Sequence, residues 1–160
     1  ALVFGNNAVK NAYEYIKNNN FDDFNNIKLN NIKKEFDNWV NEISKDDKKN
    51  NLTRNEVLIK IRNLVSENLS VVRSKEKIET LLNELNNIRA NYSIKENIKE
   101  GSIEVYLIIE SVKIMALSML EREESRGAHY RDDFKYSADK VYKLQVKREN
   151  NKIIINKIYN

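Results

Sequence analysis

The sequence contains no cysteine and no proline, and it has only three glycines and one histidine in 160 residues. The absence of cysteine excludes a disulfide framework, a thiolate metal site, iron–sulfur ligation and a cysteine nucleophile. A single histidine also excludes a histidine-rich metal site. Proline and glycine are the residues that most often interrupt helices and form tight turns, so their scarcity predicts a helical protein.

Long apolar runs and a large excess of one charge are also missing. The longest apolar run, residues 105–109, is far shorter than a membrane-spanning helix. The net charge is only +4, because acidic residues are interleaved with the lysines and arginines. Without a basic stripe or stacked aromatic residues, we expect no nucleic-acid partner. Length and a hydrophobic content of 41% suit one domain, alone or with a small appendage.

Apolar residues recur every three or four positions along most of the chain, which is the spacing of one buried helix face. Thr53 and Glu56 form a capping box at the start of one such stretch, and Ser74 and Ser102 are predicted to cap two others. Residues 91–101 are predicted to be a polar connection. The predicted helices cover residues 1–18, 27–44, 54–69, 75–90 and 102–124.

The C-terminal residues change to the period of a strand. Tyr142, Leu144 and Val146 alternate with polar residues, and residues 152–159 form a second β-rich run after Asn150-Asn151. A lone hairpin is marginally stable, so we expect it to lean on the helices. The predicted fold is mainly α: an up-down bundle of three to four core helices plus an N-terminal helix, with a small C-terminal β-hairpin.

Residues 121–134 hold the densest mixture of charge, glycine, histidine and aromatic side chains. Gly127 is predicted to end the preceding helix in a left-handed conformation. Arginines alternating with carboxylates indicate a network of charge-assisted hydrogen bonds, and the alternative is a solvated helix end. His129 is the one candidate general base, although a histidine in such a network more often orients hydrogen bonds than catalyses.

The centre of this run reads Glu124-Ser125-Arg126-Gly127-Ala128-His129-Tyr130-Arg131, followed by Asp133-Phe134. These residues resemble the signature of the C-terminal domain of succinate dehydrogenase and fumarate reductase flavoprotein subunits, and L-aspartate oxidases share a close version. Lys135 stands where that family usually has proline.

The resemblance implies a division of the chain into three parts. Residues 1–20 would be the last helix of a truncated flavin domain, residues 27–134 the helical bundle ending in the signature, and residues 135–160 the hairpin tail. The apolar start, residues 1–5, is similar to the beginning of that flavin-domain helix, so we expect the chain to be a piece of a longer protein. FAD would belong to that longer protein, with no cofactor in this chain.

The resemblance also implies the role of the signature. The family's catalytic groups lie upstream, so no catalytic, cofactor-binding or metal-binding residue is assigned, and the chain alone is expected to be inactive. Implied partners are the flavin domain of the same protein and an iron–sulfur subunit, in the cytoplasm or held peripherally at the inner membrane face; residues 1–20 could also drive self-association. The candidates for a domain or subunit interface are Glu124, Ser125, Arg126, Gly127, His129, Tyr130, Arg131 and Asp133.

Two other functions stay open at this point. The chain could be the same domain of an L-aspartate oxidase, which would need no iron–sulfur partner. It could instead be a free-standing helical interaction module that grips a charged partner through the signature.

Overall fold

The computed structural model describes residues 9, 11–15, 17–18, 26–45, 47, 52–96, 98, 101–149 and 152–159. The chain divides into two compact units, residues 1–42 and 43–160, and each is described by itself. Most of the predicted helix over residues 1–18 lies outside the described residues, although residues 11–15 and 17–18 are helical. The three-part division predicted from the family resemblance stays a prediction.

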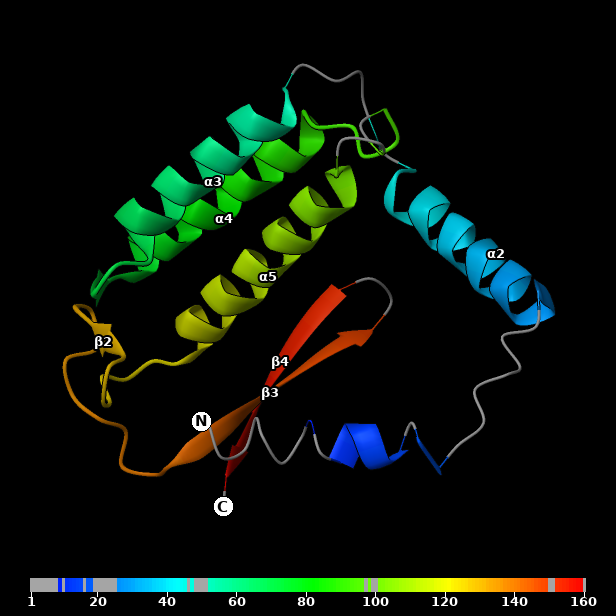
Figure 1. The fold of residues 1–160 in the computed structure, drawn as a ribbon. Coiled ribbons are helices and arrows are strands. Elements are labelled where there is room, and N and C mark those ends of the chain that lie inside the picture. Colours follow the sequence, from blue (N-terminus) through cyan, green and yellow to red (C-terminus); the bar gives the residue numbers. More distant parts are fainter. Residues whose placement is uncertain are drawn as a thin grey trace. The chain divides into compact units, whose positions relative to one another are not determined.

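Helix α2 (Asn26–Ile43) dominates the described part of the first unit and confirms the helix predicted over residues 27–44 (Figure 1). Its predicted buried face is only partly buried. Val40 is 5% exposed, but Ile32 is 56% and Phe36 44% exposed. The burial prediction is therefore wrong for these two residues, because helical spacing shows which residues share a face but not whether another element covers it.

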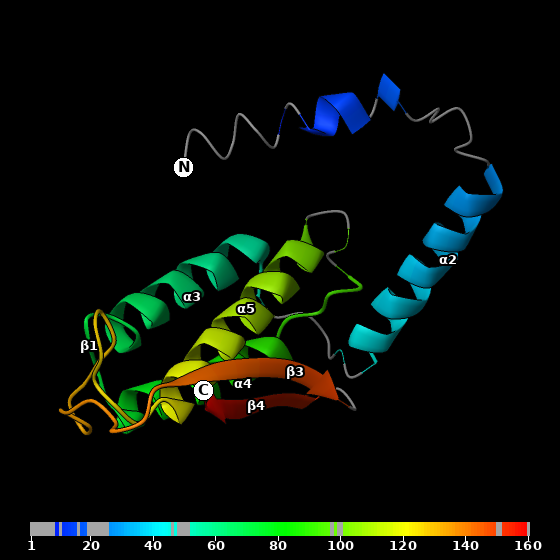
Figure 2. The same ribbon diagram turned by 90° about the horizontal axis from the view of Figure 1, so that it is seen from below.

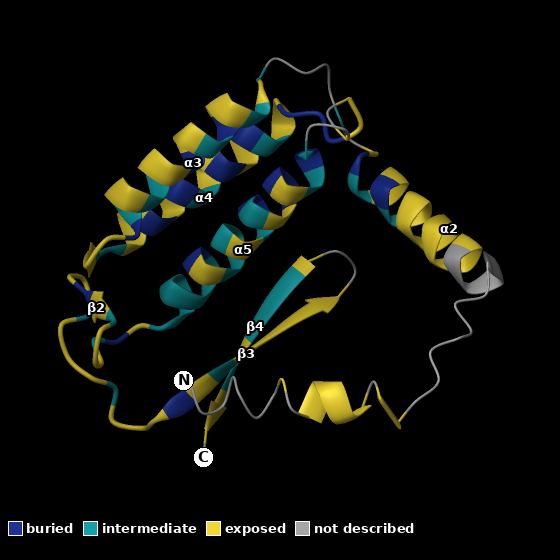
Figure 3. Cartoon of the chain, in the orientation of Figure 1, coloured by how far each residue is buried: buried dark blue, intermediate teal, exposed yellow. Residues whose placement is uncertain are grey.

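The second unit is built on three helices that run in alternating directions: α3 (Arg54–Asn68), α4 (Lys75–Ala90) and α5 (Ser102–Glu121) (Figure 1). Each packs against the other two, so their inner faces form one apolar core (Figure 3). The mainly helical fold is confirmed. The buried residues of the core are Val57, Ile61, Leu69, Ile78, Leu81, Leu85, Ile88, Tyr92, Val105, Ile109 and Ala116.

Two of the three predicted helix caps are confirmed. The Thr53 hydroxyl accepts from the Glu56 amide while the Glu56 carboxylate accepts from the Thr53 amide, and Ser74 accepts from the amide of Lys77. Ser102 is not a cap. The N-cap is Gly101, at a φ of 82°, a conformation that favours glycine.

The connection before α5 is not the polar loop that was predicted. Tyr92 and Ile94 are fully buried, and the Ser102 hydroxyl donates to the Ile94 carbonyl at 2.6 Å. Asp47 accepts from Arg89 at 2.9 Å, from the Ser93 hydroxyl at 3.1 Å and from the amide of Lys95 at 3.0 Å. The prediction failed because one distant carboxylate satisfies the polar groups of the loop, which lets its apolar side chains turn inward.

The C-terminal hairpin is present as predicted. Strands β3 (Tyr142–Glu149) and β4 (Lys152–Tyr159) pair antiparallel from Tyr142 opposite Tyr159 to Glu149 opposite Lys152 (Figure 2). The predicted turn at Asn150 and Asn151 lies outside the described residues. The hairpin packs against α5, as predicted. Lys157 forms a salt bridge with Glu121 of this helix, and Arg148 forms one with Glu110.

A second, very short ladder ties the end of the bundle together. Strand β1 (Val72–Arg73), between α3 and α4, pairs in parallel with β2 (Tyr130–Arg131), beyond α5 (Figures 1 and 2). The amide of Asp132 donates to the Arg73 carbonyl at 2.8 Å and extends the ladder. The charged run after α5 is thereby fastened to the turn between α3 and α4.

Candidate interface: the signature loop

The residues that follow α5, here called the signature loop (residues 122–138), are not helical. The predicted helix end at Glu124 is wrong, because α5 ends at Glu121. Arg131 folds back under the end of the helix and donates from Nη1 to the carbonyls of Met119 at 2.7 Å and Leu120 at 3.2 Å. A guanidinium at this position satisfies carbonyls that have no partner within the helix and opposes the negative end of its dipole.

Arg131 is 1% exposed, and its charge is balanced by Asp133. Nε and Nη2 of the arginine donate to the two carboxylate oxygens at 2.8 and 2.6 Å. The same carboxylate accepts from the amide of Lys75, the first residue of α4, at 2.9 Å. Hydrogen bonds from Arg131 and then from the Lys75 amide, working against burial, lower the pKa of Asp133 to about 2. One ion pair therefore joins the C-terminus of α5 to the N-terminus of α4.

Glu124 forms the second charged centre and is fully buried. Its carboxylate accepts from Arg122 at 2.6 Å, from Nε of Arg126 at 2.9 Å and from the amide of Ala138 at 3.0 Å. Burial alone would raise the pKa of Glu124, but these hydrogen bonds outweigh it and the pKa is lowered. The carboxylate is consequently ionised inside the protein and needs all three donors.

Ser125 connects the two centres through its hydroxyl and its main chain. Its Oγ accepts from the amide of Arg131 at 2.8 Å and donates to the Phe134 carbonyl at 2.7 Å. Its amide donates to the Tyr136 carbonyl at 3.0 Å. A small side chain with both a donor and an acceptor suits this crossing point.

Gly127 lies at the tip of a tight turn, not at the end of a helix as predicted. Arg126 and His129 exchange backbone hydrogen bonds of 2.8 and 3.1 Å across it, and Gly127 has a φ of 57°. Its positive φ is as predicted. The predicted position at a helix end is wrong because α5 ends six residues earlier, where Arg131 donates hydrogen bonds to the last carbonyls of the helix.

His129 takes part in the network as a hydrogen-bond donor. Its Nε2 lies 3.2 Å from the Arg122 carbonyl, which can only accept, so this nitrogen carries the proton. Burial, and then the positive charges of Arg73, Arg122 and Arg131, lower the pKa of His129 against the effect of the carbonyl. The ring is thus neutral near pH 7 and orients the loop.

The structure brings all eight predicted interface residues into one loop, but they differ in how far they are exposed to solvent. Glu124 and Arg131 are buried, and Ser125 and His129 are half-buried. The exposed ones are Arg126, Gly127, Tyr130 and Asp133.

Sequence reasoning missed several neighbours of the loop. Tyr136 is 87% exposed and Val71 is 76% exposed, so apolar surface borders the charged network. Arg73 donates to the Ala128 carbonyl at 3.3 Å from the other side of the β1–β2 ladder. A signal for β1 was present, because the helical period breaks at residues 69–74 just where a β-branched pair occurs.

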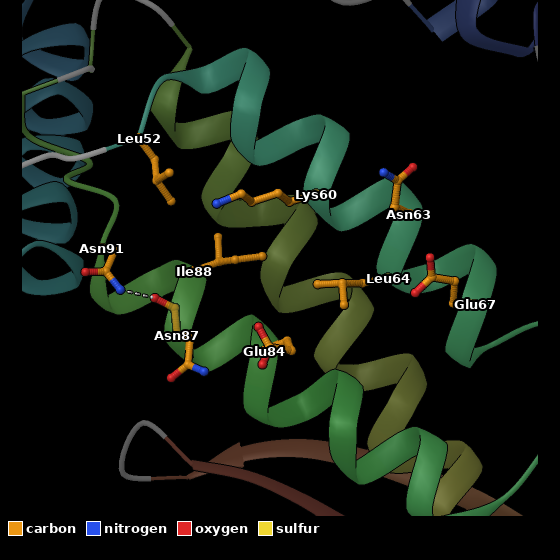
Figure 4. A pocket seen from close by; sticks show the side chains of 9 residues that line it. All are labelled: Leu52, Lys60, Asn63, Leu64, Glu67, Glu84, Asn87, Ile88 and Asn91. Carbon is orange, nitrogen blue, oxygen red and sulfur yellow. Dashed lines mark hydrogen bonds between the residues drawn. The ribbon is translucent and has the colours of Figure 1, made fainter.

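A shallow groove between α3 and α4 is a second place where a ligand could be sought (Figure 4). Apolar side chains form its floor, and amides with isolated charges from both helices form its rim. Its lining residues are Leu52, Lys60, Asn63, Leu64, Glu67, Glu84, Asn87, Ile88 and Asn91. None of these is a nucleophile paired with a base, so the groove shows no constellation for catalysis.

The described part of the chain shows neither a cluster of metal ligands nor a membrane-spanning helix. Among the described residues, no three histidine or carboxylate side chains converge to hold a metal ion. No helix there is both long enough and apolar enough to cross a membrane.

Most of the second unit, including the signature loop, matches a known family. The model of the family described as fumarate reductase flavoprotein C-term matches residues 59–153, from within α3 to the hairpin. The chain belongs to this family. The resemblance carried by residues 124–134 is thereby confirmed, and the signature loop lies entirely inside the matched region.

A curated relative and a solved structure each match about four fifths of this chain. An uncharacterized FAD-dependent oxidoreductase of Methanocaldococcus jannaschii is 30% identical over 139 residues, which cover 82% of this chain and 24% of that protein. The Escherichia coli quinol fumarate reductase FrdA, as an E245Q mutant, matches with a TM-score of 0.63 at 16% identity, over 83% of this chain and 25% of the other.

A mycobacterial structure gives the same picture. Mycobacterium smegmatis Sdh1 in complex with UQ1 matches with a TM-score of 0.51 at 16% identity, over 79% of this chain and 24% of the other. The chain therefore spans about a quarter of the length of the relatives it matches, and it corresponds to the C-terminal domain of such flavoproteins.

Proposed function

We propose that the chain is the non-catalytic C-terminal domain of an FAD-dependent succinate–fumarate oxidoreductase and that it serves domain packing and subunit assembly. The observation that carries this proposal is the pairing of charges in the signature loop. These ion pairs and hydrogen bonds join α4, α5 and the loop to one another. Glu124, Arg131 and Asp133 all have partners within the chain, which suits a rigid junction better than a site for chemistry.

The outer surface of the loop offers contacts for a neighbouring domain. Tyr130 and Tyr136 of the loop and Val71 of the adjoining turn expose apolar or aromatic surface, and Arg126 is exposed in the same loop. Aromatic residues and arginine are enriched where proteins bind one another. We place the packing surface for the flavin domain of the longer protein on these outward side chains, with Glu124 and Arg131 holding the loop in shape beneath.

The remaining parts of the proposal follow from the family. FAD would be bound by the flavin domain of the longer protein, and an iron–sulfur subunit would be the second partner. A peripheral position at a membrane would come from partner subunits. The names of the structural neighbours, a quinol fumarate reductase and an Sdh1 complex, support this function over an L-aspartate oxidase.

The decisive experiment uses the longer protein that this proposal implies, purified with any subunits that accompany it. We expect a flavin absorbance band that succinate bleaches and aspartate does not. Bleaching by aspartate alone would replace the proposal with an aspartate oxidase. A protein without flavin would overturn both and leave a helical interaction module.

The packing surface is tested in the same protein by Tyr136→Asp, which sets a charge on the outer side of the loop. If the loop packs against the flavin domain, this variant should lose flavin more readily and melt at a lower temperature. Ile59→Asp on α3 is the matched control, because Ile59 is 56% exposed and lies outside the loop. Equal behaviour of the two variants would contradict a packing role for the loop.

A further inference from the structure

The two strands of the hairpin differ in how their outer edges are protected. Within residues 142–149 and 152–159, no third strand pairs with either edge, so each edge leaves backbone N–H and C=O groups without a strand partner. Strand β3 carries Lys143, Lys147 and Arg148 along its length, and charges of this kind discourage pairing with another chain. Strand β4 instead has three consecutive isoleucines, residues 153–155.

The register of the hairpin shows which of these isoleucines face α5. Lys157 pairs with Leu144 and contacts Glu121 of α5, so Ile153 and Ile155 share the face that lies on this helix. Ile154 and Ile158 lie on the opposite face. On this face Ile158 is 43% exposed and Ile154 is half-buried.

The sequence of β4 is complementary to itself. In an antiparallel pair with a twofold axis at Ile154, this residue faces its own copy, Ile153 faces Ile155, and Lys152 faces Asn156. Isoleucine therefore meets isoleucine in all three central rows. A shift by one row that moves the axis toward Ile155 would set Lys152 against Lys157, which like charges disfavour. In β3, by contrast, a pair centred on Gln145 sets Lys143 against Lys147.

We propose that the β4 edge is a self-association surface, at which two copies of this chain join their hairpins into one four-stranded antiparallel sheet. A continuous sheet gives partners to the backbone groups along the β4 edge of each copy and sets the isoleucines of the two copies side by side. It also adds strands to a hairpin that is marginal as a pair. This inference is independent of the flavoprotein function, because it involves neither the signature loop nor a cofactor.

Sedimentation velocity of the 160-residue chain over a range of concentrations tests the surface. We expect a monomer–dimer equilibrium that Ile154→Lys weakens by about tenfold or more, because two lysines then face each other across the axis. Ile59→Lys, which adds the same charge on the exposed side of α3, should leave the equilibrium unchanged. Circular dichroism checks that both variants keep their helices.

Disulfide trapping tests the register, since the chain has no cysteine of its own. Directly opposed strand residues have Cα atoms about 4.5–5.5 Å apart, within the range that a disulfide spans. Ile154→Cys should therefore give a covalent dimer under mild oxidation. Ile158→Cys is the control: it lies on the same face, but the two introduced thiols would be about 27 Å apart along the sheet.

Three results would overturn the proposal. One is a monomer at every concentration, and another is trapping at position 158 as efficient as at position 154. The third is an association that Ile154→Lys does not weaken, which would point to another surface such as residues 1–20. None of these outcomes bears on whether the longer protein binds flavin.

Discussion

The helical core and the signature loop bury similar-sized side chains with opposite chemistry. Ile78, Leu81 and Leu85 fill the core with apolar groups at 0% exposure, whereas the loop buries Glu124 at 0% and Arg131 at 1%. Apolar burial stabilises in proportion to area and tolerates substitutes of similar volume. A buried ion is tolerable only while every partner is in place. The core should therefore respond gradually to substitution, and the loop abruptly.

The largest effect is expected from removing the guanidinium that joins α5 to α4. Arg131→Ala should lower the free energy of unfolding by about 3–5 kcal/mol, because it leaves Asp133 and the last carbonyls of α5 without their donor. Leu85→Ala in the core should lower it by about 2–5 kcal/mol through the cavity it creates. Urea denaturation of both variants measures the two effects.

A double variant separates the two kinds of burial. If the loop depends on paired charges, Asp133→Ala added to Arg131→Ala should cost much less than Asp133→Ala alone. Added to Leu85→Ala, it should cost the same as alone, since no hydrogen bond or ion pair joins Asp133 to Leu85 in the described part of the chain. Additive effects in both backgrounds would show that the charged loop behaves like the core.

Acid should weaken the loop before it weakens the core. The pKa of Asp133 is lowered from 3.8 to about 2, so the folded state holds its proton less tightly than the unfolded state does. The resulting stability is present above pH ~4 and is lost as the pH falls toward 2. For a partly exposed carboxylate we expect about 1–2 kcal/mol.

Urea titrations at pH 6, 4, 3 and 2 check this window. The gap in unfolding free energy between the wild type and Asp133→Asn should narrow as the pH falls, because protonation removes the charge that the variant lacks. Leu85→Ala should keep a constant gap across the same range. A constant gap for Asp133→Asn would show that its ion pair with Arg131 contributes no net stability.

The contrast also explains what the sequence could and could not reveal. Helices α3, α4 and α5 were predictable because their apolar residues follow one period, and Thr53 and Ser74 cap by contacts three residues away. The signature was recognisable as a charged network from its composition. Neither prediction requires knowledge of residues distant in sequence.

Two of the errors involve partners that lie further along the chain. The end of α5 depends on Arg131, ten residues beyond Glu121, and the burial of Tyr92 depends on polar bonds made by Asp47. The alternating charges after Glu121 are compatible with a helix, so nothing local marks the stop. Long-range hydrogen bonds of this kind have no periodic signal in a sequence.

The smallest effects come from two glycines with positive φ, one at the start of α5 and one in the loop. A Cβ at Gly101 would lie 3.2 Å from Nε of Arg54, whereas a Cβ at Gly127 would meet nothing within 4 Å. Gly127→Ala should therefore cost only its backbone strain, about 1 kcal/mol, and Gly101→Ala somewhat more.

Gly127→Asn sharpens this last comparison, because asparagine tolerates the left-handed conformation better than alanine does. Its melting temperature should fall between those of the wild type and Gly127→Ala. If asparagine and alanine were equally harmful at position 127, strain in the backbone could not be the reason, and a contact of the exposed turn with another molecule would have to be sought. The charged loop would then be sensitive at its surface as well as at its buried ion pairs.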